Sequence, residues 1–308
     1  PTVWADSAAK AFWGLGWIHG SYRPLQSLML IYAGQGELAK HIIPRSDLLE
    51  IDALVHRLNI PEQGRASAYR LPETERNWLQ EYQEGLAAGL EIGIKQLDCR
   101  VLRLRIPQLS SGALLSSLMV SGFLGLAQSQ ERMERALIEA VKQGANCELL
   151  EAMFEPFLEG WKPWLCQAIE SYPDWGLSSK SFGRGGGSNA WAVDGTRTQS
   201  GMPILCGDPH LQINQLPALF LEVRVRIASE YWLGASIPGI PGIAVGRNSS
   251  LAWSGTFAVA DNSDFFVERV QGENVVRSGA LEPISKRHVA IERRGQSPKN
   301  LTFRETSR

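Results

Sequence analysis

The chain contains 308 residues, of which 44% are hydrophobic, and its formal net charge is −1. This length and apolar content are sufficient for one large or two ordinary domains with a buried core. Because the charges nearly balance, no overall field favours nucleic acid, an anionic membrane or a strongly acidic ligand. We therefore expect a globular protein that binds neither nucleic acid nor membranes.

The four cysteines, at positions 99, 147, 166 and 206, lack the close spacing of metal sites and redox motifs, which favours idle thiols. No apolar run reaches the ~18 residues of a membrane span, and no secretory leader is visible, so we expect a soluble chain. The sequence opens on PTVWADSAAKAF, which resembles a strand entering a helix, and stops within the strand-like NLTFRETSR. We expect a fragment of a longer protein, in which the missing leader carries little weight.

The first half of the chain has the pattern of helices. From residue 6 to about 165, apolar residues recur at three- and four-residue spacing, as in ERMERALIEAVKQGANCELLEAMFEPFLEG. Asp6 is placed to cap the first helix, and Gly34 or Gly36 to interrupt the second.

After Ser188 the pattern changes to strands. Short β-rich runs such as ALFLEVRVRI and YWLGASI alternate with turn residues, and GRNSS and RGQSPKN predict the turns of hairpins. The two halves together predict an α+β fold, with a boundary at the glycines that precede Ser188.

The stretch GRGGGSNAWAV, residues 183–193, sets these glycines directly before Ser188. Taken alone, a glycine run is typical of a flexible linker. Here, however, a strand pattern follows Ser188 at once. The same predicted hairpin carries Asp208 and His210 where its second strand ends, and a later hairpin is followed by an acidic cluster.

These segments resemble the penicillin amidase family of N-terminal nucleophile hydrolases, which includes penicillin, cephalosporin and acyl-homoserine lactone acylases. The matching text is SNAW at 188–191, SGMPILCGDPHL, PGIAVGRNSSLAWSGT and DNSDFFVE, in the family's order and spacing. In the first half, GLGWIHGSYRPLQ keeps His19 and Arg23 of a family motif but has Tyr22 where an aspartate is usual. The resemblance covers nearly the whole chain, and its specific part lies between 188 and 268.

The resemblance implies an αββα four-layer sandwich made as a precursor that cuts itself before Ser188. It divides the chain into a helical α-chain region (1–165), a spacer (166–187) and the incomplete start of a β-chain (188–308), which form an α/β heterodimer. Glycines suit such a cut, because the Ser188 hydroxyl can attack the preceding carbonyl only where the backbone bends sharply without crowding. The freed α-amine, with a pKa of about 7.7–8, can then act as the base.

The resemblance also implies further site residues. The oxyanion would be bound by the backbone N–H of Phe257 and by an asparagine beyond residue 308. His210 would help to orient the amine, although a histidine after Asp-Pro at a strand end also suits a turn. Leu211, Val245 and Phe257 would line an apolar acyl pocket covered by the helix at 118–126, although such residues also suit a core. The remaining histidines are interpreted as structural or exposed: His19, His41, His56 and His288.

A structural calcium ion is implied by the resemblance at the acidic cluster. Its ligands would be Asp261, Asp264, the carbonyl of Ser263 and Glu134 from the helical region, because calcium prefers hard oxygen ligands. Alternatively, Asp261 and Asp264 are ordinary carboxylates of a solvent-exposed loop. No cofactor is expected for catalysis.

We therefore expect an amidohydrolase that cleaves the linear amide bond of N-acyl compounds, such as penicillin-type β-lactams or acyl-homoserine lactones. The resemblance implies a periplasmic or secreted protein with a role in antibiotic response or biosynthesis. Two alternatives stay open. One is a conventional Ser-His-Asp hydrolase using Ser188 and His210, although the common G-x-S-x-G elbow is missing. The other is a truncated, inactive homologue kept as a binding module.

Overall fold

The structure is a computed structural model of the chain, and it describes residues 1–123, 128–154, 167, 169, 187–211, 217–256, 266 and 268–307. These residues form two compact units. The first contains the described parts of 1–121, 186–257 and 288–302, and the second contains those of 122–185, 258–287 and 303–308. Helices and strands share the core of the first unit, which agrees with the α+β expectation. The sequence analysis divides the chain differently, into an α-chain region, a spacer and a β-chain, and that division stays a prediction.

Most of the described residues from 8 to 154 are helical, as the periodicity of this part of the chain predicts. The helices up to residue 122 are α1 (Ala8–Tyr22), α2 (Pro24–Gln35), α3 (Leu38–His41), α4 (Ser46–Arg57), α5 (Ile60–Arg70), α6 (Glu73–Gly93), α7 (Leu97–Val101) and α8 (Ser111–Gly122). The prediction of Asp6 as the first cap is wrong, because α1 begins one residue later: Ser7 Oγ accepts the N–H of Lys10. Gly36 ends α2 with φ 66°, a conformation that glycine adopts without strain.

Helices α1 and α6 pack with their backbones in contact. A Cβ atom added at Gly16 would lie 2.2 Å from the carbonyl oxygen of Tyr82, and one added at Gly85 would lie 1.9 Å from that of Trp13. Gly20, Gly89 and Gly93 are equally close to the opposite backbone. Since only glycine allows such an approach, glycines spaced four residues apart on each helix determine which faces meet.

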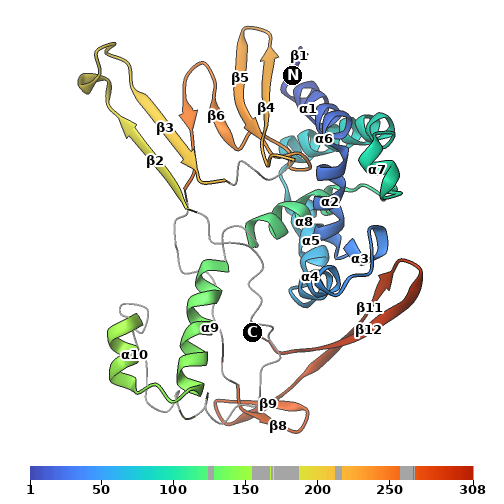
Figure 1. Ribbon diagram of the computed structural model, residues 1–308, viewed down its shortest axis with the longest axis vertical. Helices are drawn as coiled ribbons and strands as arrows, with labels where there is room; N and C mark the ends of the chain where they lie inside the picture. Colours follow the sequence, from blue (N-terminus) through green and yellow to red (C-terminus); the bar gives the residue numbers. More distant parts are fainter. Residues whose placement is uncertain are drawn as a thin grey trace. The chain divides into compact units, whose positions relative to one another are not determined.

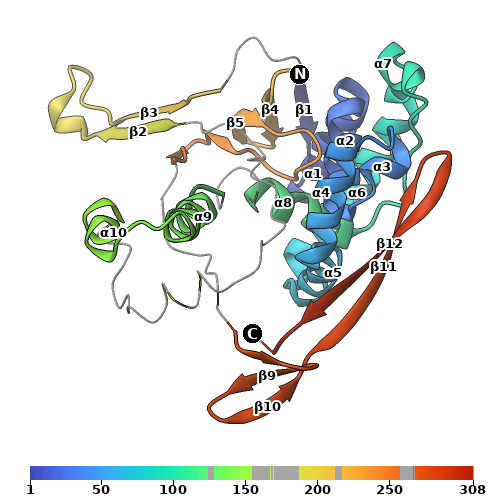
Figure 2. The ribbon, with the colours of Figure 1, turned by 60° about the horizontal axis from the view of Figure 1, so that its bottom comes forward.

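A mixed sheet packs against these helices (Figure 1; Figure 2). Its strands run in the order β1 (Thr2–Ala5), β4 (Leu221–Ile227), β5 (Glu230–Ser236), β6 (Val245–Arg247) and β7 (Ala252–Trp253). Strand β1 pairs in parallel with β4, and the other neighbours are antiparallel. Along β4, Val223 and Val225 are buried in the core while Arg224 is exposed, so one face of the sheet covers the helices.

The remaining strands of the chain form hairpins and a small meander. Strands β2 (Ser188–Val193) and β3 (Ile204–Pro209) pair antiparallel, and so do β11 (Ser285–Arg293) and β12 (Gln296–Glu305). The turn predicted at GRNSS joins β6 and β7. In RGQSPKN the turn is shorter than predicted: Arg294 and Gly295 close it, Gly295 with φ 69°, and β12 begins at the next residue.

The second unit contains α9 (Gln128–Lys142) and α10 (Cys147–Phe154). Val141 of α9 and Leu150 of α10 form a small core together with Ile169. The unit also contains a meander of β8 (Val270–Gln271), β9 (Asn274–Arg277) and β10 (Ala280–Pro283). In this meander the guanidinium of Arg277 forms ion pairs with Glu268 and Glu282.

Four histidines outside the candidate site have the structural or exposed positions that the sequence analysis expects. His19 is fully buried and hydrogen-bonded, and burial lowers its pKa to about 3. His41 stacks on Tyr32, His56 lies 3.2 Å from the carbonyl oxygen of Gly36, and His288 is exposed. None of these four touches the segment around Ser188 in a described contact.

Cys99 is buried, and burial raises the pKa of its thiol to about 12, so it is no reactive thiolate at neutral pH. This agrees with an idle thiol at this position. Among the described helices, none has both the length and the apolar character that crossing a membrane requires.

Candidate active site

Ser188 is the first residue of β2, and the register of the β2–β3 hairpin brings the predicted site residues together. Ser188 lies opposite Pro209, and Asn189 lies opposite Asp208. The hairpin forms because two runs with strand patterns flank a turn region rich in glycine, serine and threonine. His210, the residue after β3, therefore lies beside the residue before β2.

That residue is Gly187, whose carbonyl belongs to the bond predicted to be cut. The main-chain N–H of His210 donates to the carbonyl oxygen of Gly187 across 2.9 Å. This hydrogen bond polarises the carbonyl, and it can also stabilise negative charge on the oxygen when a nucleophile adds to the carbon. The sequence analysis did not single out this donor, although the hairpin register contains the information.

The imidazole of His210 also lies close to Gly187. A Cβ atom at Gly187 would lie only 2.8 Å from His210 Nδ1. A side chain at this position would therefore push the imidazole away, so the last glycine of the run makes room for His210 as well as loosening the backbone.

His210 Nε2 has two different neighbours. It lies 3.0 Å from Asn189 Nδ2 and 3.2 Å from Asp208 Oδ2. Both neighbours belong to the hairpin itself, so the pairing of β2 with β3 determines where the imidazole lies.

The hydroxyl of Ser188 contacts a residue that the sequence analysis did not identify. Thr256 Oγ1 lies 2.7 Å from Ser188 Oγ and 2.9 Å from the carbonyl oxygen of Ser188. The two positions are 68 apart in the sequence, which explains why no local pattern indicates the contact.

Residues 254–256 follow β7 and run along the hairpin. Ser254 Oγ would lie 1.9 Å from a Cβ atom at Gly207, so only glycine fits at this point of β3. Val245, one of the predicted pocket residues, reaches the same position of β3, 3.8 Å from that Cβ. Leu211, another predicted pocket residue, is exposed beside His210.

Several predicted site residues lie outside the residues that the structure describes. They are Phe257, expected to supply an oxyanion N–H and to line the pocket, and the calcium candidates Asp261, Ser263 and Asp264. Glu134, the fourth calcium candidate, lies in α9 of the second unit. Within the described residues, no cluster of three or more His, Cys, Asp or Glu side chains is arranged for a metal ion.

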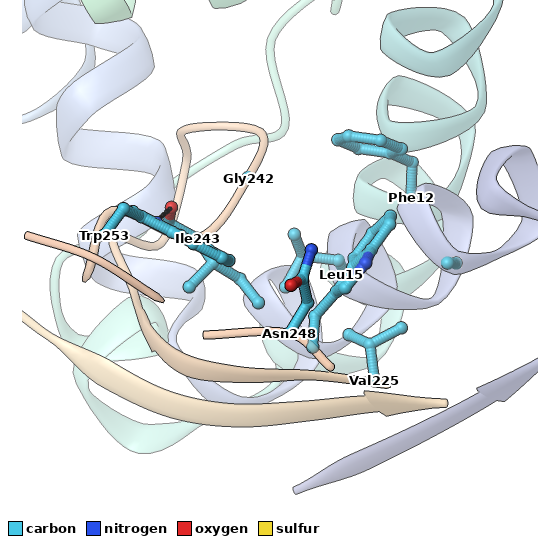
Figure 3. A pocket seen from close by; sticks show the side chains of 9 residues that line it. Phe12, Leu15, Val225, Gly242, Ile243, Asn248 and Trp253 are labelled. Atoms are coloured by element: carbon cyan, nitrogen blue, oxygen red, sulfur yellow. Dashed lines mark hydrogen bonds between the residues drawn. The ribbon is translucent and has the colours of Figure 1, made fainter. Parts of the chain in front are cut away.

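The first unit also contains an apolar cavity of about 270 Å³ between α1 and the sheet. Its lining comprises Ala11, Phe12, Leu15, Val225, Trp232, Gly242, Ile243, Asn248 and Trp253. Figure 3 shows the Asn248 carboxamide in the middle of this lining, with Ile243 and Trp253 on one side and Phe12 on the other. Neither Leu211 nor Val245 lines it, so this cavity differs from the acyl pocket expected from the sequence.

Comparisons with a family model and with individual known proteins agree with each other. The family model described as penicillin amidase matches residues 1–308. Over 99% of its length, the chain is 25% identical to the acyl-homoserine lactone acylase QuiP of Pseudomonas aeruginosa and to the penicillin acylase 2 proenzyme of Pseudomonas sp. strain SE83. It is 27% identical, over 97% of its length, to QuiP of Pseudomonas putida. The chain spans 38%, 41% and 38% of these three relatives. Because the family model matches every residue from the first to the last, this chain belongs to the penicillin amidase family.

Proposed function

We propose that the chain carries the nucleophile of an amidohydrolase that cleaves the linear amide bond of N-acyl compounds, and that Ser188 becomes this nucleophile when the precursor cuts itself after Gly187. The observation that carries the proposal is the environment of this one peptide bond. The Gly187 carbonyl accepts a hydrogen bond from the His210 N–H, and the Ser188 hydroxyl is held by Thr256. Carbonyl and hydroxyl are both fixed where the chain enters β2.

Self-cleavage would begin with attack of Ser188 Oγ on the carbonyl carbon of Gly187. The C–N bond breaks, the Ser188 nitrogen takes the hydroxyl proton, and Gly187 becomes esterified to Oγ. Water then hydrolyses the ester, which leaves Gly187 as a carboxylate and Ser188 as a free amino terminus. During the attack, the His210 N–H can stabilise the developing oxyanion.

In the mature enzyme the freed α-amine would take the proton of Ser188 Oγ while Oγ attacks the acyl carbonyl of the substrate. The amine product leaves, and water hydrolyses the acyl-enzyme. The amide nitrogen of the uncut chain cannot act as this base, so the precursor should be inactive. His210 would orient the amine, and the Phe257 N–H with a downstream asparagine would bind the oxyanion of the substrate.

Further parts of the proposal extend the family likeness. The whole protein would have the αββα four-layer fold and would work as an α/β heterodimer, either in the periplasm or as a secreted protein, with a structural calcium at Asp261, Ser263, Asp264 and Glu134. Leu211, Val245 and Phe257 would contact an apolar acyl group. The names of the relatives, acyl-homoserine lactone acylase and penicillin acylase, suggest the two substrate classes to test first.

The test is expression of the full reading frame that contains this chain, followed by intact mass measurement and N-terminal sequencing. A new chain starting Ser-Asn-Ala-Trp is expected, and Ser188→Ala should leave one uncut polypeptide. Ser200→Ala, which changes an exposed serine in the same hairpin, is the matched control and should be cut normally. The mature protein is then assayed on aryl-acetyl and fatty-acyl amides, including β-lactams and acyl-homoserine lactones. An uncut chain with full activity would instead favour the conventional Ser-His-Asp hydrolase.

A further inference from the structure

Thr256 contacts Ser188 at two atoms. Its hydroxyl donates to the carbonyl oxygen of Ser188 across 2.9 Å, because a carbonyl oxygen can only accept. The same Thr256 Oγ1 lies 2.7 Å from Ser188 Oγ. One hydroxyl thus holds both the main chain and the side chain of the same serine.

A nucleophilic attack requires Ser188 Oγ to lie at the correct place beside the carbonyl carbon, so a contact that fixes the position of Oγ favours the attack. Thr256 also bonds both the backbone and the side chain of Ser188, which restricts the χ1 torsion of the serine. The threonine itself is β-branched, so its own hydroxyl has few alternative positions.

The main chain at Thr256 is positioned by contacts that do not use its hydroxyl. Trp253 in β7 donates its indole N–H to the carbonyl oxygen of Ile243 across 3.0 Å, and Ser254 packs closely on Gly207. Thr256 is itself exposed. Loss of its hydroxyl should therefore leave the fold intact and release only Ser188.

From these contacts we infer that Thr256 is a positioning residue that orients the Ser188 hydroxyl for attack, both on the Gly187 carbonyl during self-cleavage and on the acyl substrate afterwards. The inference rests on the proposed role of Ser188 as the nucleophile. Thr256 takes up no charge and forms no covalent bond in either step; it fixes the position of Ser188 Oγ.

The experiment compares the rate of self-cleavage in three variants of the full reading frame. Thr256→Val keeps the shape and loses both hydrogen bonds, and we expect cleavage to slow by about tenfold, since each bond contributes about 0.5–1.5 kcal/mol. Thr256→Ser keeps the hydroxyl and should cut within about twofold of the wild-type rate. Ser249→Ala, which changes an exposed serine in the turn between β6 and β7, is the matched control and should be cut at the wild-type rate.

A second measurement separates orientation from folding. In a Ser188→Ala background, which keeps one polypeptide and the main-chain carbonyl at position 188, Thr256→Val removes a single exposed hydrogen bond and should lower the urea midpoint of unfolding only slightly. Wild-type cleavage in Thr256→Val would overturn the inference, and so would equal slowing in Thr256→Ser, because the loss would then not depend on the hydroxyl. A wild-type protein that is never cut after Gly187 would overturn the proposed function, and the inference about Thr256 with it. Failure of the inference alone looks different, because the wild-type protein is then cut and only the Thr256 variants depart from expectation.

Discussion

The imidazole of His19 in α1 lies 2.7 Å from the hydroxyl of Tyr82 in α6, and its other nitrogen lies 2.9 Å from Ser236 Oγ in β5. Ser236 Oγ donates to the carbonyl oxygen of Leu221, so it accepts the Nε2–H of His19, and Nδ1 accepts the hydroxyl proton of Tyr82. The helical layer and the sheet are thus joined through a neutral histidine in the core of the first unit.

The burial of His19 predicts that the free energy of unfolding depends on pH. Burial lowers the pKa of His19 from 6.5 to about 3, so between these values the unfolded chain binds a proton that the native state does not. The contribution of His19 to the free energy of unfolding should therefore fall as the pH falls from about 6.5 towards about 3. Burial also raises the pKa of Asp52 to about 6, which opposes this trend between about pH 4 and pH 6.

Because the two trends oppose each other, the measurement is a difference between variants. We expect His19→Gln in the Ser188→Ala background to be less stable than its parent at pH 7.5, and the gap to narrow by up to about 1.4 kcal/mol per pH unit below pH 6.5. Urea unfolding at a series of pH values gives both curves. A gap that stays constant down to pH 4.5 would show that His19 titrates normally in the native state.

The close approach of α1 and α6 predicts that Gly85 tolerates no side chain. Its added Cβ would lie 1.9 Å from the carbonyl oxygen of Trp13, and backbone cannot move aside as a side chain can. Gly85→Ala should lower the free energy of unfolding by about 2 kcal/mol or more, although alanine is the better helix former. The control is Gly122→Ala in α8, where an added Cβ meets no atom of the described residues within 4 Å and stability should stay constant or rise slightly. Equal stability of both variants would contradict the close contact.

The elements that could be predicted from sequence are those that depend on near neighbours. The period of the helices, the strand at Ser188 and the stop at Gly36 depend on residues within one or two turns. Ser7 displaced Asp6 as the cap because both residue types accept N–H groups equally well, and only the start of the helix decides between them.

The missed features are relationships between distant segments. Nothing in GLGWIHG indicates that its glycines face those of the helix at 73–93, because a glycine on a helix face has the same local pattern whether or not another backbone meets it. Thr256 was missed for the same reason: a threonine after a short strand is ordinary until its hydroxyl is found beside Ser188. The resemblance to a family identifies positions such as Ser188, whereas partners of this kind appear only in three dimensions.

The contact between Gly187 and His210 predicts a coupling between the two residues. Gly187→Ala should displace the imidazole, whose Nδ1 would lie 2.8 Å from the new methyl group, and so slow self-cleavage. If the methyl group acts through the ring, the same substitution should have little further effect in a His210→Ala protein, which has no ring to displace. The four cleavage rates form a double-mutant cycle. Additive losses would show that the glycine matters only for its backbone freedom.

Arg294, in the turn between β11 and β12, makes long-range contacts that should stabilise the first unit. Arg294 Nη1 donates to the carbonyl oxygens of Leu102, Ile42 and His41 across 2.7, 3.0 and 3.2 Å, and these groups lie at or just beyond the C-terminal ends of α7 and α3. Carbonyls at helix ends lack intrahelical partners and carry partial negative charge, so a guanidinium satisfies both their hydrogen bonding and their electrostatics.

Arg294→Met keeps much of the side-chain length but removes every one of these donors, and we expect a loss of about 2–3 kcal/mol in the free energy of unfolding. Arg294→Lys can reach fewer carbonyls, so its free energy of unfolding should lie between those of the wild type and Arg294→Met. The neighbouring Arg293→Met is the control, because Arg293 donates only to Ser297 within its own hairpin among the described contacts, and its loss should stay below about 1 kcal/mol. Urea unfolding gives the stabilities, and amide hydrogen exchange at the last turns of α3 and α7 gives the location. Faster exchange throughout the chain, rather than at these two helix ends, would show that Arg294 does not act where the contacts place it.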